Sequence, residues 1–173
     1  MRVALLSDGR RQFLSFVLPG DLIGYCGHSA PLAVATTAAL TDVVVAAAPS
    51  PSLSPGLSEA YEVSRAFDEA HLLSQILRLG RMNAHKRLTD LMLELRERLD
   101  MAGLVLGDSF DAPLTQEALG DALGLTSVHI NRTLKRMRLD GDLVWKSGRI
   151  CLPDPARLAA QIGRVPVSVT SSN

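Results

Sequence analysis

Two short helical segments joined by a tight, glycine-containing turn constrain this chain more than any other feature. Thr115 precedes the helical run 116–123, Gly124 follows it, and Thr126 precedes a second helical run over 127–139. Threonine side chains accept hydrogen bonds from the unpaired N–H groups of a first helical turn, and glycine commonly ends a helix. Two helices joined in this way form a helix-turn-helix.

The residues after this motif predict a wing. The spacing inside the motif buries a set of apolar side chains between its two helices: Ala118, Leu119, Ala122, Leu125, Ile130 and Leu134. Asp140-Gly141-Asp142 then stops the second helix, and 143–145 and 150–152 read as two strands around a four-residue loop. A generic helical hairpin is the simpler interpretation, but turn, caps, wing and basic second helix together favour DNA binding.

Basic charge is concentrated in the same segment. The chain has 18 Lys and Arg against 18 Asp and Glu, so its formal net charge is zero. Between Thr126 and Arg149 there are six basic residues and two acidic ones, whereas 12–64 contains no Lys or Arg. Because the distribution of charge matters more than its sum for binding a polyanion, the C-terminal third is the predicted DNA-binding end.

The N-terminal part is predicted to be rich in β-structure. Short strands are expected at 12–18, at Leu22–Tyr25 and, as the best single prediction, at Val43–Val45, with a turn at Pro19-Gly20-Asp21. The alanine-rich sequence around the last of these strands also permits a helix. The Pro- and Ser-rich run 49–56 is typical of a linker.

Two longer helices are predicted between the linker and the helix-turn-helix, over 57–80 and 83–99, followed by a loop at 103–111. The second helix has an apolar face of Leu88, Leu91, Met92, Leu95 and Leu99. The first has an apolar stripe of Phe67, Ala70, Leu73, Ile76 or Leu77, and Gly80. This stripe comes close to the 3.5-residue repeat of a helix pair between two copies, although burial in the chain's own core is the other interpretation.

The remaining polar chemistry points to no metal, cofactor or membrane partner. Cys26 and Cys151 form no CxxC pair or zinc pattern, and Cys26 with His28 supplies too few ligands for a tetrahedral site. Residues 1–10 lack the apolar run of a signal peptide, and no stretch approaches the ~20 apolar residues of a membrane span. We therefore expect a cytoplasmic protein.

The segment LTQEALGDALGLTSVHINRTLKRMRLDGDLVWKSGRICL (114–152) resembles the DNA-binding domain of the Crp/Fnr family of bacterial regulators. DGRRQFLSFVLPGDLIG (8–24) resembles the later strands of that family's β-roll sensor domain, and 84–99 matches the first helix of its DNA-binding domain. The resemblance implies an α+β fold with four parts. These are a partial β-roll (a jelly-roll remnant) over 1–56, a long dimerisation helix over 57–82, a winged helix-turn-helix over 83–164 and a tail over 165–173.

The effector chemistry of the family is missing from these residues. Members that bind cyclic nucleotides pair the phosphate with an Arg that follows a Gly-Glu pair, but here Tyr25 follows Gly24 and 12–64 has no basic residue. Members that hold an iron–sulfur cluster need four thiolates, which two cysteines cannot supply. We expect neither cyclic AMP nor such a cluster to bind.

The resemblance also implies which residues contact DNA. In the family, the second helix of the motif enters the major groove, which places Ser127, Val128, Asn131 and Arg132 at the base edges. Arg132 suits guanine, Asn131 suits adenine, and Val128 suits a thymine methyl group. Phosphate contacts are expected from Thr115, Gln116, Thr126 and Lys135, and from Lys146 and Arg149 of the wing.

The predicted function is therefore that of a sequence-specific transcription regulator that binds a palindromic site in double-stranded DNA as a homodimer. RNA polymerase is a further candidate partner. The alternative is an interaction protein that does not bind DNA and pairs with a full-length relative. An enzyme such as a small cupin is the third class, and the lack of a His/Glu cluster or a Ser/His/Asp arrangement argues against it.

Overall fold

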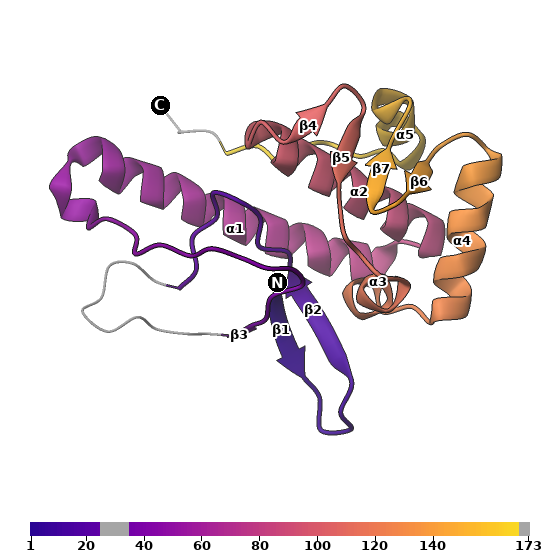
Figure 1. Cartoon of the computed structure of the whole chain (residues 1–173), viewed down its shortest axis with the longest axis horizontal. Helices are drawn as coiled ribbons and strands as arrows, with labels where there is room; N and C mark the ends of the chain where they lie inside the picture. Colours follow the sequence, from indigo (N-terminus) through magenta and orange to yellow (C-terminus); the bar gives the residue numbers. More distant parts are fainter. Residues whose placement is uncertain (25–34, 170–173) are drawn as a thin grey trace.

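The computed structural model describes residues 1–24 and 35–169 as an α+β chain with two small antiparallel sheets, which confirms the predicted fold class (Figure 1). The longest helix, α1 (Pro55–Arg81), projects well beyond the C-terminal helices and strands (Figure 1). Three residues discussed above lie outside the described residues. They are Tyr25, the last residue of a predicted strand, and Cys26 and His28, the two candidate metal ligands. No helix in the described ranges is long and apolar enough to span a bilayer.

The N-terminal sheet has the strand order β2-β1-β3. Its strands are β1 (Arg2–Leu5), β2 (Arg11–Ser15) and β3 (Thr36–Thr37), and β1 and β2 form an antiparallel hairpin. One face of this hairpin is apolar, since Val3 and Phe13 are buried. The predicted turn at 19–21 is present, with the Asp21 N–H donating to the Leu18 carbonyl at 3.0 Å.

The prediction of a strand at Val43–Val45 is wrong. These residues belong to no strand, and the Val44 side chain is 100% exposed. Residues 22–24 are not a strand either. High β-propensity describes a side chain that fits a pleated, half-buried surface, and neither segment has a neighbouring strand in the described part of the chain.

Three helical elements follow: η1 (Pro51–Leu53), α1 (Pro55–Arg81) and α2 (Ala84–Met101). Ser54 caps α1 by accepting from the Leu57 N–H, and Pro at the first helical position is already in a helical conformation. Asn83 caps α2 in the same way. The helices are therefore two separate elements joined by only two residues.

The C-terminal part is a winged helix-turn-helix. Its helices are α3 (Gln116–Leu123), α4 (Ser127–Leu139) and α5 (Pro155–Ile162), and its sheet has the order β4-β5-β7-β6. The strands are β4 (Val105–Leu106), β5 (Ser109–Asp111), β6 (Val144–Lys146) and β7 (Arg149–Cys151). The predicted bounds of α3 and α4 are confirmed.

Three elements of this domain were not predicted. The loop expected at 103–111 contains β4 and β5, and β5 pairs with β7 of the wing. Helix α5 begins after Asp154, which caps it, and ends at Gly163 with φ 69°. An Asp-Pro start and a glycine end are recognisable helix signals, so α5 could have been found in the sequence.

A single apolar cluster joins the hairpin to the winged domain. Phe13 and Phe16 pack in the same cluster as Leu88 of α2, Leu119 of α3 and Ile150 of β7. The side of α1 that packs against this part of the chain is polar, because it buries His71, Gln75 and Arg78. Of the apolar stripe predicted on α1, Leu73, Ile76 and Leu77 lie on the exposed side of the helix, whereas Phe67 is half-buried and stacks on His71.

Candidate nucleic-acid interface

The turn between α3 and α4 is fixed by local hydrogen bonds. Thr115 accepts from the Ala118 N–H at 3.0 Å, and Thr126 accepts from the His129 N–H at 3.4 Å. Gly124 ends α3 with φ 62°, a left-handed conformation that glycine adopts without strain. The Leu125 N–H then donates to the Gly120 carbonyl at 3.2 Å, which folds the turn back onto α3.

Helix α4 separates a buried face from an exposed one. Ile130, Leu134 and Met137 are buried against the domain. The residues predicted to read bases, Ser127, Val128, Asn131 and Arg132, are all exposed, as is Lys135. Val128 is 71% exposed, which is unusual for a valine and leaves it available to an apolar group of a ligand. Helix α4 lies at the edge of the molecule, opposite the projecting end of α1 (Figure 1).

The other predicted contact residues are also on the surface. Thr115, Gln116, Thr126, Lys146 and Arg149 are exposed. Lys146 and Arg149 are paired in register across the wing, whose turn has positive φ at Ser147 (49°) and Gly148 (78°). Two consecutive positive φ angles are typical of a type I′ hairpin turn, which holds the two cations side by side.

The cations of this surface differ in their ion pairing. Within residues 1–24 and 35–169, no carboxylate forms an ion pair with Arg132, Lys135 or Lys146. By contrast, Arg136 of α4 pairs with Asp140 at 2.7 Å, and Arg149 lies 3.4 Å from Asp111. In the described part of the chain, these three cations therefore have no carboxylate partner that a ligand would have to displace.

A buried polar junction between α1 and α2 was not predicted from the sequence. Arg78 of α1 is 2% exposed and donates to three groups. Its partners are Asp90 at 2.7 Å, Glu94 at 2.5 Å and the Gln75 side-chain carbonyl at 2.5 Å. These contacts tie α1 to α2. The signal was present in the sequence, because His71, Gln75 and Arg78 follow helical spacing on one face of α1.

The junction continues in both directions along the chain. Arg164, which follows α5, donates to Asp90 at 2.5 Å and to Glu97 at 2.6 Å. Arg98 of α2 donates to Asp21 at 2.5 Å and to the Phe16 carbonyl at 3.0 Å. The turn after the hairpin, both long helices and the C-terminal segment are therefore connected by alternating charges.

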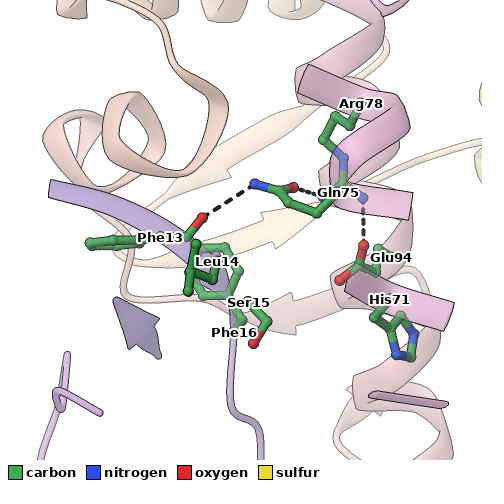
Figure 2. Close-up of a pocket in the computed structure, with 8 residues that line it drawn as sticks. All are labelled: Phe13, Leu14, Ser15, Phe16, His71, Gln75, Arg78 and Glu94. Carbon is green, nitrogen blue, oxygen red and sulfur yellow. Dashed lines mark hydrogen bonds and ion pairs between the residues drawn. The ribbon is translucent and has the colours of Figure 1, made fainter. Parts of the chain in front are cut away.

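A small cavity lies beside this junction, between β2, α1 and α2 (Figure 2). Its volume is about 10 Å³, the room of a single water molecule, and Phe16, His71 and Glu94 are among its lining residues. Burial and the nearby Arg98 lower the pKa of His71 below its usual value, against the opposing charge of Glu94. His71 is accordingly neutral at pH 7.

The described residues contain no group of three or more His, Cys, Asp or Glu side chains that could hold a metal ion. Cys151, on β7, is a free thiol.

Comparison with known proteins identifies the family. Residues 86–161 match the Crp-like helix-turn-helix domain family. The nitrogen fixation regulation protein FixK of Bradyrhizobium diazoefficiens is 32% identical over 163 residues, which cover 90% of this chain and 67% of that protein. The chain belongs to the Crp/Fnr family of transcription regulators.

Other Crp/Fnr relatives agree with this assignment. The transcriptional activator protein FnrL of Cereibacter sphaeroides is 29% identical over 170 residues, covering 91% of this chain and 67% of FnrL. The structure of FixK2 from Bradyrhizobium japonicum superposes with a TM-score of 0.67 at 24% identity, covering 92% of this chain and 80% of FixK2. A CRP-family regulator from Thermus thermophilus gives 0.70 at 21% identity, covering 94% of this chain and 83% of that one.

Membership in the Crp/Fnr family confirms two predictions. The chain is a transcription regulator with a helix-turn-helix, and it is not an enzyme. The chain spans about two thirds of the length of these two sequence relatives.

Proposed function

We propose that this Crp/Fnr chain binds a palindromic site in double-stranded DNA as a homodimer and reads the base sequence with α4. The observation that carries the proposal is the exposed face of α4, on which Arg132 and Lys135 have no carboxylate partner among the described residues. DNA would supply the missing partners, a guanine base for Arg132 and a phosphate for Lys135. A helix of this kind fits the major groove, with its N-terminal residues at the base edges.

The individual roles are proposed from the resemblance to the family arrangement, and the exposure of each side chain is consistent with them. Arg132 is proposed to donate to guanine, Asn131 to pair with adenine, and Val128 and Ser127 to contact the neighbouring base edges. The remaining exposed residues are proposed to hold phosphates: Thr115, Gln116, Thr126, Lys135, Lys146 and Arg149. Contacts of this second kind fix the register of a protein on DNA without reading its sequence.

Helix α1 supports the homodimer. Its buried side is polar, whereas Leu73, Ile76 and Leu77 are 56%, 67% and 59% exposed. The interpretation that this stripe belongs to the chain's own core therefore fails for these three residues. Apolar side chains at such spacing pair well with a second copy of the same helix, and two copies would bring two α4 helices to a palindrome.

Replacing Leu73 and Ile76 together by glutamate tests whether the exposed stripe of Leu73, Ile76 and Leu77 is the dimer seam. We expect the dimer dissociation constant to rise by at least about 100-fold, because an unpaired charge buried at the seam costs several kcal/mol. Sedimentation equilibrium measures it. Leu106→Glu, at a residue of β4 that is 69% exposed, is the matched control and should leave the dimer intact. A double variant that remains dimeric would exclude this face.

The salt dependence of binding tests the phosphate contacts. Plots of the logarithm of affinity against the logarithm of salt concentration should be steep for the natural sequence, because bound cations release condensed counterions. Lys135→Ala should reduce the slope by about 1 for each subunit bound and weaken binding to all sequences alike. Arg81→Ala, an exposed residue at the end of α1, is the control. An unchanged slope for Lys135→Ala would remove this residue from the interface.

We propose no role for a cyclic nucleotide, because 12–64 contains no Lys or Arg to pair its phosphate. Activity is proposed to take place in the cytoplasm, with RNA polymerase as a candidate further partner. The same exposed seam on α1 also fits the second candidate function, pairing with a longer relative. A folded chain that dimerises but binds no DNA would favour that candidate.

A further inference from the structure

The winged domain is attached to α1 by a very short connection. Helix α1 ends at Arg81 and α2 begins at Ala84, so Met82 and Asn83 alone join them. A few residues between packed elements are a common hinge. In a dimer formed through α1, the angle at this hinge would determine both the distance and the relative rotation of the two α4 helices.

Side chains from outside α3 hold the C-terminal end of that helix. The last carbonyl groups of a helix have no partner within it and must find one elsewhere. The Ala122 carbonyl accepts from Gln75 of α1 at 2.6 Å and from Gln12 of β2 at 3.3 Å. The Leu123 carbonyl accepts from Arg87 of α2 at 2.9 Å, and Arg87 also donates to the Leu79 carbonyl of α1.

Gln75 joins three elements with one amide group. It is 8% exposed, and its nitrogen donates to the carbonyls of Phe13 in β2 and Ala122 in α3. Its oxygen accepts from Arg78. Figure 2 shows the Gln75 side chain extending from α1 towards Phe13, next to the Arg78–Glu94 pair. Helix α3 is thus fixed to α1 and to the hairpin at one point.

The hairpin adds a second attachment to α3, made by Arg11. Its guanidinium donates a hydrogen bond to Glu117 at 2.7 Å. It also forms an ion pair with Asp121 at 2.9 Å, which lacks hydrogen-bond geometry. Arg11 is separated from these residues by more than 100 positions in sequence. Arg11 and Gln12 therefore hold both ends of one face of α3, while α3 in turn packs against α4.

We infer that the β1–β2 hairpin, through Arg11 and Gln12, acts together with the Arg78 contacts between α1 and α2 to fix the angle between the winged domain and α1, and that it so restricts the half-site spacing that the dimer accepts. Arg11 and Gln12 are positioning residues in this account, because they act through α3 and not on DNA. The inference rests on the proposed function. On this inference, the dimer selects DNA by the distance between the two half-sites as well as by the half-site sequence that α4 reads.

Selection from duplexes that carry two half-sites separated by spacers of different length tests the inference. One base pair of spacer shifts a half-site by about 3.4 Å and rotates it by about 35°, so a rigid dimer must discriminate between adjacent spacers. The Arg11→Ala/Gln12→Ala variant should keep the half-site sequence and lose about tenfold of its preference for the best spacer over its neighbours. Arg11→Lys, with Gln12 retained, should keep most of that preference.

Two further variants make the test specific. Arg10→Ala removes a neighbouring hairpin cation that pairs with Asp8 and should leave the spacing preference unchanged. Glu117→Gln with Asp121→Asn removes both negative charges that face Arg11, which weakens the contact from the α3 side. It should broaden the spacing even if the hairpin variant fails to fold. In the DNA-free protein, amide hydrogen exchange over 116–125 should accelerate in both double variants and not in Arg10→Ala.

The outcomes separate the inference from the function on which it rests. Broader spacing with an unchanged half-site supports the inference. An enriched half-site with unchanged spacing tolerance in both double variants overturns the inference and leaves the proposed function standing. A folded natural sequence that enriches no half-site overturns both.

Discussion

Replacing Arg78 by methionine is expected to lower the free energy of unfolding by about 3 kcal/mol, close to the lower end of what breaking a buried ion pair costs. The guanidinium is 2% exposed, and the carboxylates of Asp90 and Glu94 that it bridges are each 5% exposed. Methionine fills similar space but neutralises neither acid. The expected loss of unfolding free energy stays near the lower end of this range because each acid retains another ion pair. Asp90 still pairs with Arg164, and Glu94 still pairs with Arg98.

Urea unfolding measures this effect, with all variants at one protein concentration because dimerisation would add to the apparent stability. Arg81→Met is the matched control. It removes an exposed arginine from the last turn of the same helix and should change the free energy of unfolding by less than about 0.5 kcal/mol. If Arg78→Met behaves like Arg81→Met, the junction is accessible to water and does not tie α1 to α2.

Gly120→Ala is expected to destabilise the winged domain by about 1–3 kcal/mol, although alanine is the better helix former by about 1 kcal/mol. A Cβ at this position would lie 2.8 Å from the Leu125 carbonyl oxygen, which is backbone of the turn. The same turn is hydrogen-bonded to the Gly120 carbonyl, so it cannot move away independently of α3. The angle between α3 and α4 must change, and we expect DNA affinity to fall with stability.

Gly56→Ala supplies the comparison for Gly120→Ala. Gly56 is also helical, in the first turn of α1, and a Cβ there would have no atom within 4 Å. Its replacement should leave the thermal midpoint unchanged or raise it. Equal effects of the two substitutions would mean that the turn of the helix-turn-helix adapts to an added methyl group.

The helix-turn-helix could be predicted because its determinants are local. Thr115, Gly124 and Thr126 act on backbone groups within a few residues, and the apolar spacing of α3 and α4 is set by helix geometry. The wing followed from the same kind of signal, a short loop between two apolar runs. The exposure of every predicted contact residue agrees with the expected surface, while their roles on DNA remain predictions.

The features that could not be predicted depend on contacts between distant parts of the chain. Val43–Val45 has the composition of a strand, but no neighbouring strand in the described part of the chain supplies its hydrogen bonds. Strands β4 and β5 are short, and β5 pairs with a strand about forty residues later. Helical spacing places Arg78 on one face of α1 with His71 and Gln75, but it does not reveal which acids Arg78 meets. Its partners and the attachment of Arg11 to α3 become visible only when the elements are packed together.

The most direct test of the central claim is selection from a pool of random DNA duplexes, with Arg132→Ala and Arg136→Ala beside the natural sequence. Both arginines are exposed on α4, but Arg136 already pairs with Asp140. The natural sequence should enrich an inverted repeat, and Arg136→Ala should retain it. Arg132→Ala should lose its preference for guanine at one position of each half-site by about 10- to 100-fold, since a bidentate contact contributes about 1–3 kcal/mol of discrimination. A folded natural sequence that enriches no motif, or an Arg132→Ala variant that enriches the same motif equally well, would contradict the account.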